Sequence, residues 1–298
     1  MKHSKDIQVY DKKGRNIVDI KKAAWNALSP ETQKAYTSDY KLFFEHIQKD
    51  VKDVTANDIL EYIDHLRGNG NVNDTINRKI ASLSKMFKIA VIAGEIRENP
   101  VAVLKEFQKI TMKTSKEVRC TLSIKDVQKV TTPKKNDTIY TQQLICIIKT
   151  LAKTGLRISE LTGIKNSDIY EHNKRTLLVR ILGKGRKERF IYLEKVHHKE
   201  IKKLYPNVEG CDFLFYSSRH RRYCRKALWK RTSEFFQERI GKKFHPHMAR
   251  HFFITYKISV EKQDIKSVSR YVGHQDTSTT LNMYVNTSLD VESSKVKI

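Results

Sequence analysis

Five polar residues and one tyrosine in the second half of the chain have side chains suited to phosphodiester chemistry. In chain order they are Arg157, Lys184, His247, Arg250, His274 and Tyr284. An arginine guanidinium donates two parallel hydrogen bonds and keeps its charge, which suits the non-bridging oxygens of a phosphate. Lysine and histidine can move protons, and a tyrosine hydroxyl can attack the phosphorus. Together these residue types predict a site that holds and cleaves a phosphodiester.

Two of the local motifs suggest other kinds of site, which their spacing disfavours. The Gly-Lys-Gly of residues 183–185 looks like part of a nucleotide-binding loop. It lacks the GxxxxGK[ST] spacing, and it does not lie between a strand and a helix. The three histidines of residues 245–251 suggest a metal, but they lack the HExxH spacing and have no carboxylate or cysteine ligand nearby. We therefore predict no metal site and no cofactor.

Four motifs in a fixed order carry a resemblance to a known family. They are Thr-Gly-Leu-Arg-Ile-Ser-Glu-Leu at 154–161, Gly-Lys-Gly-Arg-Lys-Glu-Arg at 183–189, His-Pro-His-Met-Ala-Arg-His at 245–251, and Gly273-His274 followed ten residues later by Tyr284. The set resembles the active site of the tyrosine recombinases, also called the phage integrase family. The resemblance extends over about residues 30–290.

The resemblance implies how the phosphate would be held. Arg157 and Arg250 would bind its non-bridging oxygens, and His274 would hydrogen-bond an oxygen as well. Two neighbours would support them. Glu160, one helical turn after Arg157, is placed to orient it or nearby groups, and His251 would help to pack or orient the site.

The resemblance also implies a reaction. Tyr284 would be the nucleophile, Lys184 the general acid for the departing 5′ oxygen, and His247 a proton-transfer group. The implied function is site-specific DNA recombination through a 3′-phosphotyrosyl intermediate and a Holliday junction, without ATP or a metal. The implied partners are double-stranded DNA with inverted-repeat core sites, a homotetramer on paired sites and accessory DNA-bending proteins, with no membrane involved.

Two alternatives stay open. A type IB topoisomerase uses a similar residue set, and a non-catalytic DNA-binding protein can share the scaffold. The compact size, the helical N-terminal half and Gly273-His274 favour the recombinase over the topoisomerase. A non-catalytic relative is expected to lose at least one of the six residues, and all six are present. The sequence names neither the DNA site nor the biological role, whether integration of a mobile element or resolution of replicon dimers.

The charge of the chain points to a polyanionic partner. The formal net charge is +25 and the pI is about 9.8. Residues 116–298 contain 38 Lys and Arg against 18 Asp and Glu, a net charge of +20. A balance this basic in a folded protein is typical of nucleic-acid binding. We expect DNA contacts from the basic loop after residue 183 and from the basic run 219–226, namely from Arg186, Lys187, Arg189, Arg221, Arg222 and Arg225. A solvated helix face is the ordinary alternative for such a run.

No segment of the sequence resembles a membrane span or a secretion signal. The N-terminus is charged from Lys2 onward, and no stretch approaches the roughly 20 apolar residues that a span requires. The four cysteines show no CxxC spacing, so we interpret them as reduced thiols. These features predict a soluble, cytoplasmic protein.

Helical periodicity and capping signals dominate the first half. Ser29-Pro30 is typical of a helix start, and Thr55 with Asp58 resembles a capping box. Gly68-Asn69-Gly70 ends that helix, and a further apolar stripe follows over 76–91. The aromatic residues of these stripes are interpreted as core rather than as base-stacking groups.

The second half mixes helices with two strands. Ser123 is typical of an N-cap, and a strongly apolar helix is predicted over about 137–153. Strand-like runs follow at 176–182 and 188–193, joined as a hairpin, and helical patterns resume from about residue 221. We therefore predict a mainly α fold with a small antiparallel β-sheet, arranged as a two-domain clamp of a helical core-binding domain and a catalytic domain.

The predicted domains follow from these elements and from the polar stretch between them. They are a basic N-terminal segment 1–28, a helical SAM-like core-binding domain 29–112, a linker 113–122, and a catalytic domain 123–298 with a C-terminal tail 285–298.

Overall fold

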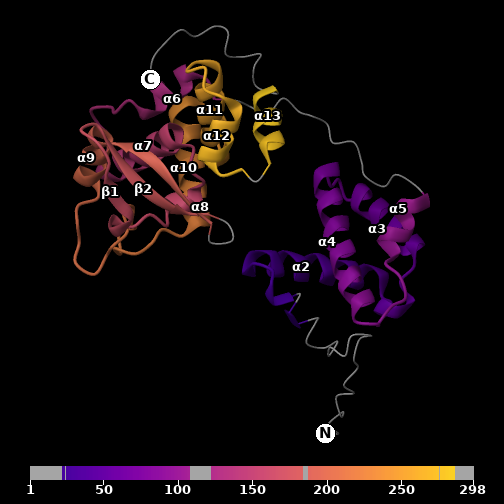
Figure 1. Cartoon of the computed structure of the whole chain (residues 1–298). Coiled ribbons are helices and arrows are strands. Elements are labelled where there is room, and N and C mark those ends of the chain that lie inside the picture. The colour runs from indigo at the N-terminus through magenta and orange to yellow at the C-terminus, as the bar shows by residue number, and fades with distance from the viewer. Residues whose placement is uncertain (1–21, 24, 108–121, 184–186, 275, 286–298) are drawn as a thin grey trace. The chain divides into compact units, whose positions relative to one another are not determined.

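The computed structural model describes residues 22–23, 25–107, 122–183, 187–274 and 276–285, and for residues 282–285 the backbone alone. The chain divides into two compact units, Met1–Lys116 and Glu117–Ile298 (Figure 1). The basic segment before residue 22, most of the predicted linker and the tail after residue 285 lie outside the described residues. Within the described part of the chain, each helix is too short or too polar to span a bilayer.

Unit 1 is helical in all its described elements. They are α2 (Pro30–Ile47), the short η1 (Val51–Asp53), α3 (Ala56–Gly68), α4 (Asn73–Ile92) and α5 (Pro100–Phe107). The predicted starts are confirmed: the Ser29 side chain caps α2, and Thr55 and Asp58 form the capping box of α3. Phe43 and Phe87 are fully buried and pack edge-on to one another, with ring centroids 5.9 Å apart. These aromatic side chains therefore belong to the core, as predicted.

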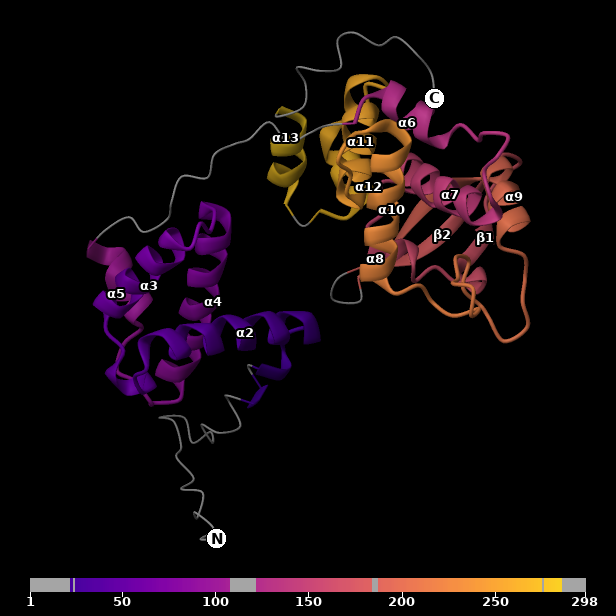
Figure 2. The same ribbon diagram turned by 180° about the vertical axis from the view of Figure 1, so that it is seen from behind.

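Unit 2 combines helices with one small sheet. Its elements are α6 (Ile124–Thr131), α7 (Ile139–Thr154), α8 (Ile158–Leu161), η2 (Asn166–Asp168), β1 (Ile169–Glu171), β2 (Thr176–Leu182), β3 (Glu188–Glu194), α9 (Lys195–Leu204), α10 (Arg225–Ile240), α11 (Pro246–Ser259), α12 (Ile265–Val272) and α13 (Thr277–Val285). Helix α10 contacts α6 and α7 and is seen beside α7 in the view from behind (Figure 2), and the two core-forming helices α7 and α11 pack against each other. The mainly α fold with a small antiparallel sheet is confirmed.

The sheet has the order β1-β2-β3 with antiparallel pairing throughout. In the β2–β3 hairpin Leu182 pairs with Glu188, so the loop after residue 182 carries the predicted lysine. Alternate side chains of β2 and β3 point into the core of the unit and are buried; they are Leu177, Val179, Ile181, Ile191 and Leu193. This alternation fixes which residues of β3 face inward along the strand.

The end of α7 determines where α8 begins. Gly155 closes α7 in the left-handed conformation, with φ of 64°, and a Cβ there would lie 2.5 Å from the ring of Phe253 on α11. A glycine is required for both reasons. The chain therefore turns tightly against α11. Arg157 is the N-cap of α8, the residue directly before this helix.

Three elements differ from the predictions. Helix α9 was not predicted, because half of its residues are charged and its buried positions are few, namely His197 and Ile201. Strand β1 has three residues, too few for an alternation to be visible. Helix α10 begins at Arg225 rather than near residue 221, because Tyr216 and Arg222 pair in a β-bridge that keeps the preceding segment extended.

Candidate active site

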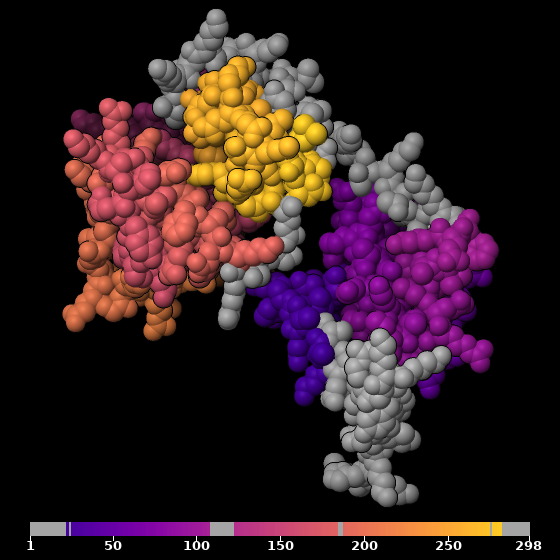
Figure 3. Space-filling model, in the orientation of Figure 1, coloured from indigo at the N-terminus to yellow at the C-terminus, as the bar shows by residue number. Residues whose placement is uncertain are grey.

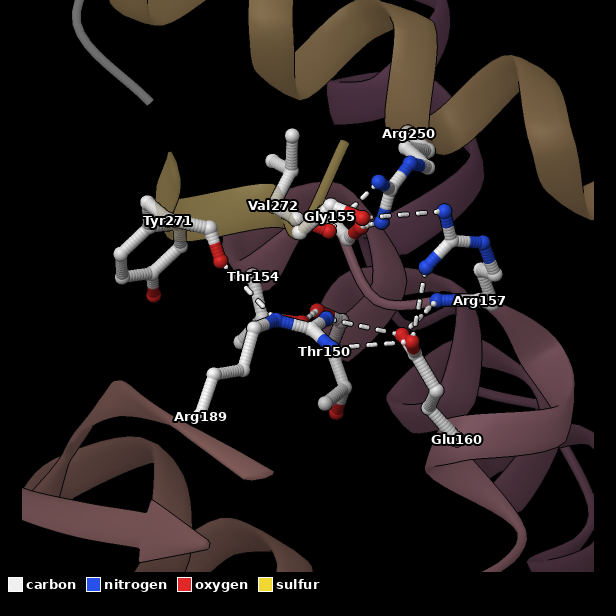
Figure 4. Close-up of polar contacts among 10 residues, drawn as sticks. Thr150, Thr154, Gly155, Arg157, Glu160, Arg189, Arg250, Tyr271 and Val272 are labelled. Carbon is white, nitrogen blue, oxygen red and sulfur yellow. Dashed lines mark hydrogen bonds and ion pairs between the residues drawn. The ribbon is translucent and has the colours of Figure 1, made fainter. Parts of the chain in front are cut away.

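Three arginines from three separate elements donate hydrogen bonds to three consecutive carbonyls where α12 ends. They are Arg157 before α8, Arg189 on β3 and Arg250 on α11, and Figure 4 shows their guanidinium groups converging on this point. The distances are 2.9 Å from Arg189 Nε to Tyr271 O, 2.6 Å from Arg250 Nη2 to Val272 O, and 3.4 Å from Arg157 Nη2 to Gly273 O. The last carbonyls of a helix lack intrahelical partners and carry partial negative charge, which explains the attraction.

Arg250 is the most deeply placed of the three. Its side chain is fully buried, and Nη1 donates to the carbonyl of Gly155, 2.8 Å away. The residue therefore joins the C-terminal ends of α7 and α12. Burial, together with the nearby charge of Arg157, lowers the pKa of Arg250. Among the described residues its Nε, which is itself buried, finds no acceptor.

Glu160 is the counter-ion of two of these arginines. Its side chain is 4% exposed and accepts hydrogen bonds from Nη1 of Arg157 and from both terminal nitrogens of Arg189, each at 2.9 Å. Burial alone disfavours the charged carboxylate, but the hydrogen bonds from Arg189 and Arg157 outweigh it, and the pKa of Glu160 is lowered. Glu160 thus contacts Arg157, which it is predicted to orient, and Arg189 as well.

His274 lies at the same place because it directly follows Gly273, the C-cap of α12. Gly273 closes that helix with φ of 73°, which turns the chain toward the arginines. Burial, followed by the charges of Arg250 and Arg157, lowers the pKa of His274 to about 4. The imidazole is therefore neutral at neutral pH, and its electrostatic coupling to the arginines shows that it belongs to their cluster.

Helix α11 brings the other histidines to this region. Pro246 occupies its first turn, and positions 247, 250 and 251 share one face of the helix. The rings of His247 and His251 pack edge-on, with centroids 4.8 Å apart, and His251 is buried. The charge of His247 acts on His274. The structure thus brings together Arg157, His247, Arg250 and His274 of the six predicted catalytic residues.

The other two catalytic candidates are only partly described. Lys184, with its predicted DNA-contacting neighbour Arg186, lies outside the described residues. Lys187 is exposed where β3 begins, and its carbonyl accepts a hydrogen bond from Gly183 N at 2.8 Å, which closes the hairpin loop. The backbone of Tyr284 is helical, in α13, which packs against α11 and α12. In the space-filling view these C-terminal helices form one continuous yellow-to-gold surface (Figure 3).

One predicted DNA contact needs correction. Arg189 points into unit 2, with 14% of its side chain exposed, and its donors are engaged by Glu160 and Tyr271 O, because the elements around it bury these acceptors. The three predicted contacts of the basic run, Arg221, Arg222 and Arg225, are all exposed, and their DNA contacts stay predictions. Arg222 also donates from Nε to Thr162 O and from Nη2 to Ser159 O, so it caps the end of α8.

The cluster as a whole is suited to binding an oxyanion. Several cationic and hydrogen-bond donor groups from separate elements converge, and their positions are fixed before any ligand arrives. Such pre-positioned donors stabilise charge that develops on phosphate oxygens during transfer. Within the described residues, no group of three or more His, Cys, Asp or Glu could hold a metal ion.

Comparison with known proteins identifies the class. Residues 121–289 match the phage integrase family, and residues 24–94 match the phage integrase N-terminal SAM-like domain. The chain therefore belongs to the phage integrase family, the tyrosine recombinases. A relative named tyrosine recombinase XerD, from Halalkalibacterium halodurans, is 27% identical over 266 residues, which cover 85% of this chain and 86% of the relative. Another, tyrosine recombinase XerC of Bacillus licheniformis, is 28% identical and covers 83% of this chain and 82% of its own length.

Solved structures share the fold. A lambda integrase dimer bound to a COC′ core site superposes with a TM-score of 0.72 at 17% identity, covering 94% of this chain and 98% of that one. The Tn1549 transposon integrase in complex with a circular intermediate DNA gives a TM-score of 0.63 at 18% identity, covering 90% of this chain and 94% of that one. A lambda integrase tetramer bound to a Holliday junction gives 0.66 at 17% identity, covering 88% and 76%.

Proposed function

We propose that the protein cuts and rejoins double-stranded DNA at specific sites, with Tyr284 as the nucleophile. The observation that carries the proposal is the convergence of Arg157, Arg250 and His274 where α12 ends, directly before the helix that bears Tyr284. Family membership supports the same chemistry. The arginines would hold the two non-bridging oxygens, and His274 would add a hydrogen bond.

The proposed step conserves the energy of the phosphodiester. The Tyr284 oxygen attacks the phosphorus, the bond from phosphorus to the 5′ oxygen breaks, and a 3′-phosphotyrosine and a free 5′ hydroxyl result. Lys184 gives its proton to the leaving oxygen, while His247 takes part in the proton transfers around the attacking hydroxyl. A 5′ hydroxyl of the partner strand then attacks the phosphotyrosine and releases Tyr284. One phosphoester bond replaces another in each step, so we propose that neither ATP nor a metal is required.

The assembly that we propose follows the same chemistry. Exchange of strands between two duplexes needs four cleavages, hence a homotetramer on paired sites with inverted-repeat core sequences, passing through a Holliday junction. The lambda integrase tetramer bound to a Holliday junction supports this arrangement. We further propose that residues 29–112 bind the core site, that residues 113–122 link them to the catalytic domain 123–298, that the tail 285–298 docks on a neighbouring subunit, and that DNA-bending proteins assist in the cytoplasm.

Covalent capture tests the proposal. The full-length protein is mixed with genomic DNA without ATP and with EDTA, denatured in SDS, and the protein-linked ends are sequenced. We expect ends linked to Tyr284 at a small set of inverted-repeat sites. A nicked suicide duplex of such a site should then trap the adduct quantitatively. Ends spread over all sequences, with relaxation of plasmids that lack any special site, would indicate a topoisomerase. Tight DNA binding without any adduct would indicate a non-catalytic protein.

A further inference from the structure

The buried hydroxyl of Thr280 contacts the imidazole of His274. Thr280 Oγ1 lies 2.7 Å from His274 Nδ1, and the Thr280 side chain has no exposed surface. Thr280 belongs to α13, which packs on α11 and α12, whereas His274 follows the end of α12. The contact therefore lies between the helix that bears position 284 and the arginine cluster.

The chemistry of the two groups limits how they can serve a phosphate. A neutral imidazole has one N–H and one lone pair, while a hydroxyl can either donate or accept. Phosphate oxygens only accept. His274 can bind a phosphate through Nε2 only if that nitrogen carries the proton, and Nδ1 must then accept a hydrogen bond. Thr280 supplies a donor at Nδ1. Burial and the nearby arginines lower the pKa of His274 to about 4, so the free enzyme holds the neutral ring to which this reasoning applies.

We propose that Thr280 is a positioning residue that donates its hydroxyl to Nδ1 of His274 and thereby presents the Nε2–H group to the scissile phosphate. The presentation to phosphate rests on the proposed function, whereas the tautomer is a property of the free protein. Thr280 lies one helical turn before position 284. The same hydrogen bond therefore fastens the helix of the nucleophile to the residue that holds the phosphate, so both are placed together.

The tautomer can be measured without DNA. The full chain is labelled with ¹⁵N-histidine, long-range ¹H–¹⁵N correlations are recorded at neutral pH, and the His274→Asn variant identifies the signal of His274. We expect the Nε2–H form in the wild type and in Thr280→Ser, which keeps a hydroxyl. Thr280→Val, of nearly equal size, should lose this preference. A wild-type protein in the Nδ1–H form, or a Thr280→Val variant with an unchanged tautomer, would overturn the proposal.

Cleavage of a nicked suicide duplex at saturating enzyme provides the second readout. Loss of the hydrogen-bond partner that orients a metal-bound histidine typically costs about 10- to 100-fold, and we expect the same range for His274. We expect Thr280→Val to cleave about 10- to 100-fold more slowly while binding the duplex as tightly as the wild type, and Thr280→Ser to cleave at nearly the wild-type rate. Thr279→Val is the matched control. Thr279 is the exposed neighbour of Thr280, so this substitution should change neither the cleavage rate nor the affinity for the duplex.

The outcomes separate the two proposals. Equal losses in Thr280→Ser and Thr280→Val, or wild-type cleavage by Thr280→Val, would show that the hydroxyl does not position His274 for the reaction. If the wild type cleaves no DNA at all, the proposed function fails. In that case the tautomer measurement still decides whether Thr280 donates to His274.

Discussion

Arg189 and Glu160 form a two-pronged ion pair, in which each terminal nitrogen of the guanidinium lies 2.9 Å from a different carboxylate oxygen. The pair joins β3 to the start of α8, and the third donor of Arg189 reaches Tyr271 O at the end of α12. Glu160 in turn holds Arg157. One buried carboxylate therefore sets the mutual positions of the hairpin strand, of Arg157, for which we propose phosphate binding, and of the turn that leads to His274.

Breaking this pair should destabilise unit 2. Removing one partner leaves a buried charge poorly compensated, which typically costs about 3–5 kcal/mol. Arg189→Met should show such a loss in urea unfolding. The fluorescence of Trp229 reports on the unfolding of unit 2. The measurement uses the Trp25→Phe chain, because Trp25 of unit 1 would otherwise contribute to the signal. Arg225→Met removes the same charge from an exposed position and should change the free energy of unfolding little. Equal effects of the two substitutions would contradict the structural role.

The same pair predicts a dependence on pH. The folded-state pKa of Glu160 is lowered, so its contribution to stability is fully present above the unfolded pKa of about 4.3 and is lost as the pH falls through the lower, folded value. The difference in unfolding free energy between the wild type and Arg189→Met should therefore be constant near neutral pH and shrink below about pH 4. Unfolding titrations of both chains across this range test it. A difference that grows on acidification would contradict the assignment.

Tyr284→Phe tests the nucleophile. The substitution removes only the hydroxyl, so the variant should bind its duplex with the wild-type affinity but form no covalent adduct on the nicked suicide substrate. Gel analysis after SDS denaturation measures the adduct. An SDS-resistant complex that persists in Tyr284→Phe would assign the nucleophile to another residue.

Lys184→Ala tests the general acid. An alkoxide leaves slowly unless it is protonated, and a positioned acid contributes typically about 10²- to 10⁴-fold. The variant should therefore cleave ordinary DNA slowly while binding it nearly as well as the wild type. A substrate with sulfur at the bridging 5′ position needs no proton and should restore most of the rate. The rate of Arg157→Ala should not be restored, since the proposed role of Arg157 is to hold non-bridging oxygens. Rescue of Lys187→Ala instead would move the role to Lys187.

Arg225 and Arg222 form a matched pair for testing the basic run. Both residues are exposed, but Arg222 also donates to two carbonyls of the α8 region. If Arg225 contacts a phosphate, Arg225→Ala should weaken binding to all sequences alike and reduce the slope of log K against log salt concentration by about 0.9. Arg222→Ala should in addition slow cleavage, because it loosens α8. Binding titrations at several salt concentrations decide this, and an unchanged slope for Arg225→Ala would make it a solvated residue.

Local signals in the sequence determined much of the fold and the family. The caps at Ser29, Thr55 and Ser123 were predicted correctly because the capping side chain bonds within three residues of itself. Gly155 ended α7 as predicted, because a glycine readily adopts the left-handed conformation that closes a helix. The four motifs indicated the phage integrase family, which the family match confirmed. The roles of the six catalytic candidates stay predictions until the substitutions are measured.

Only the tertiary structure decided where the charged side chains go. In the sequence Arg189 and Arg222 are members of basic runs. A run of charge does not show which of its members donates to an acceptor within the protein. Arg189 reaches Tyr271 O across 82 residues of chain, and Arg157 reaches Gly273 O across 116. In the sequence Thr280 is one of several small polar residues before Tyr284. Only the packing of α13 shows that Thr280 is buried against His274. Residue types and local spacing determined which groups this protein has, whereas the packing of distant helix ends determined which of them meet.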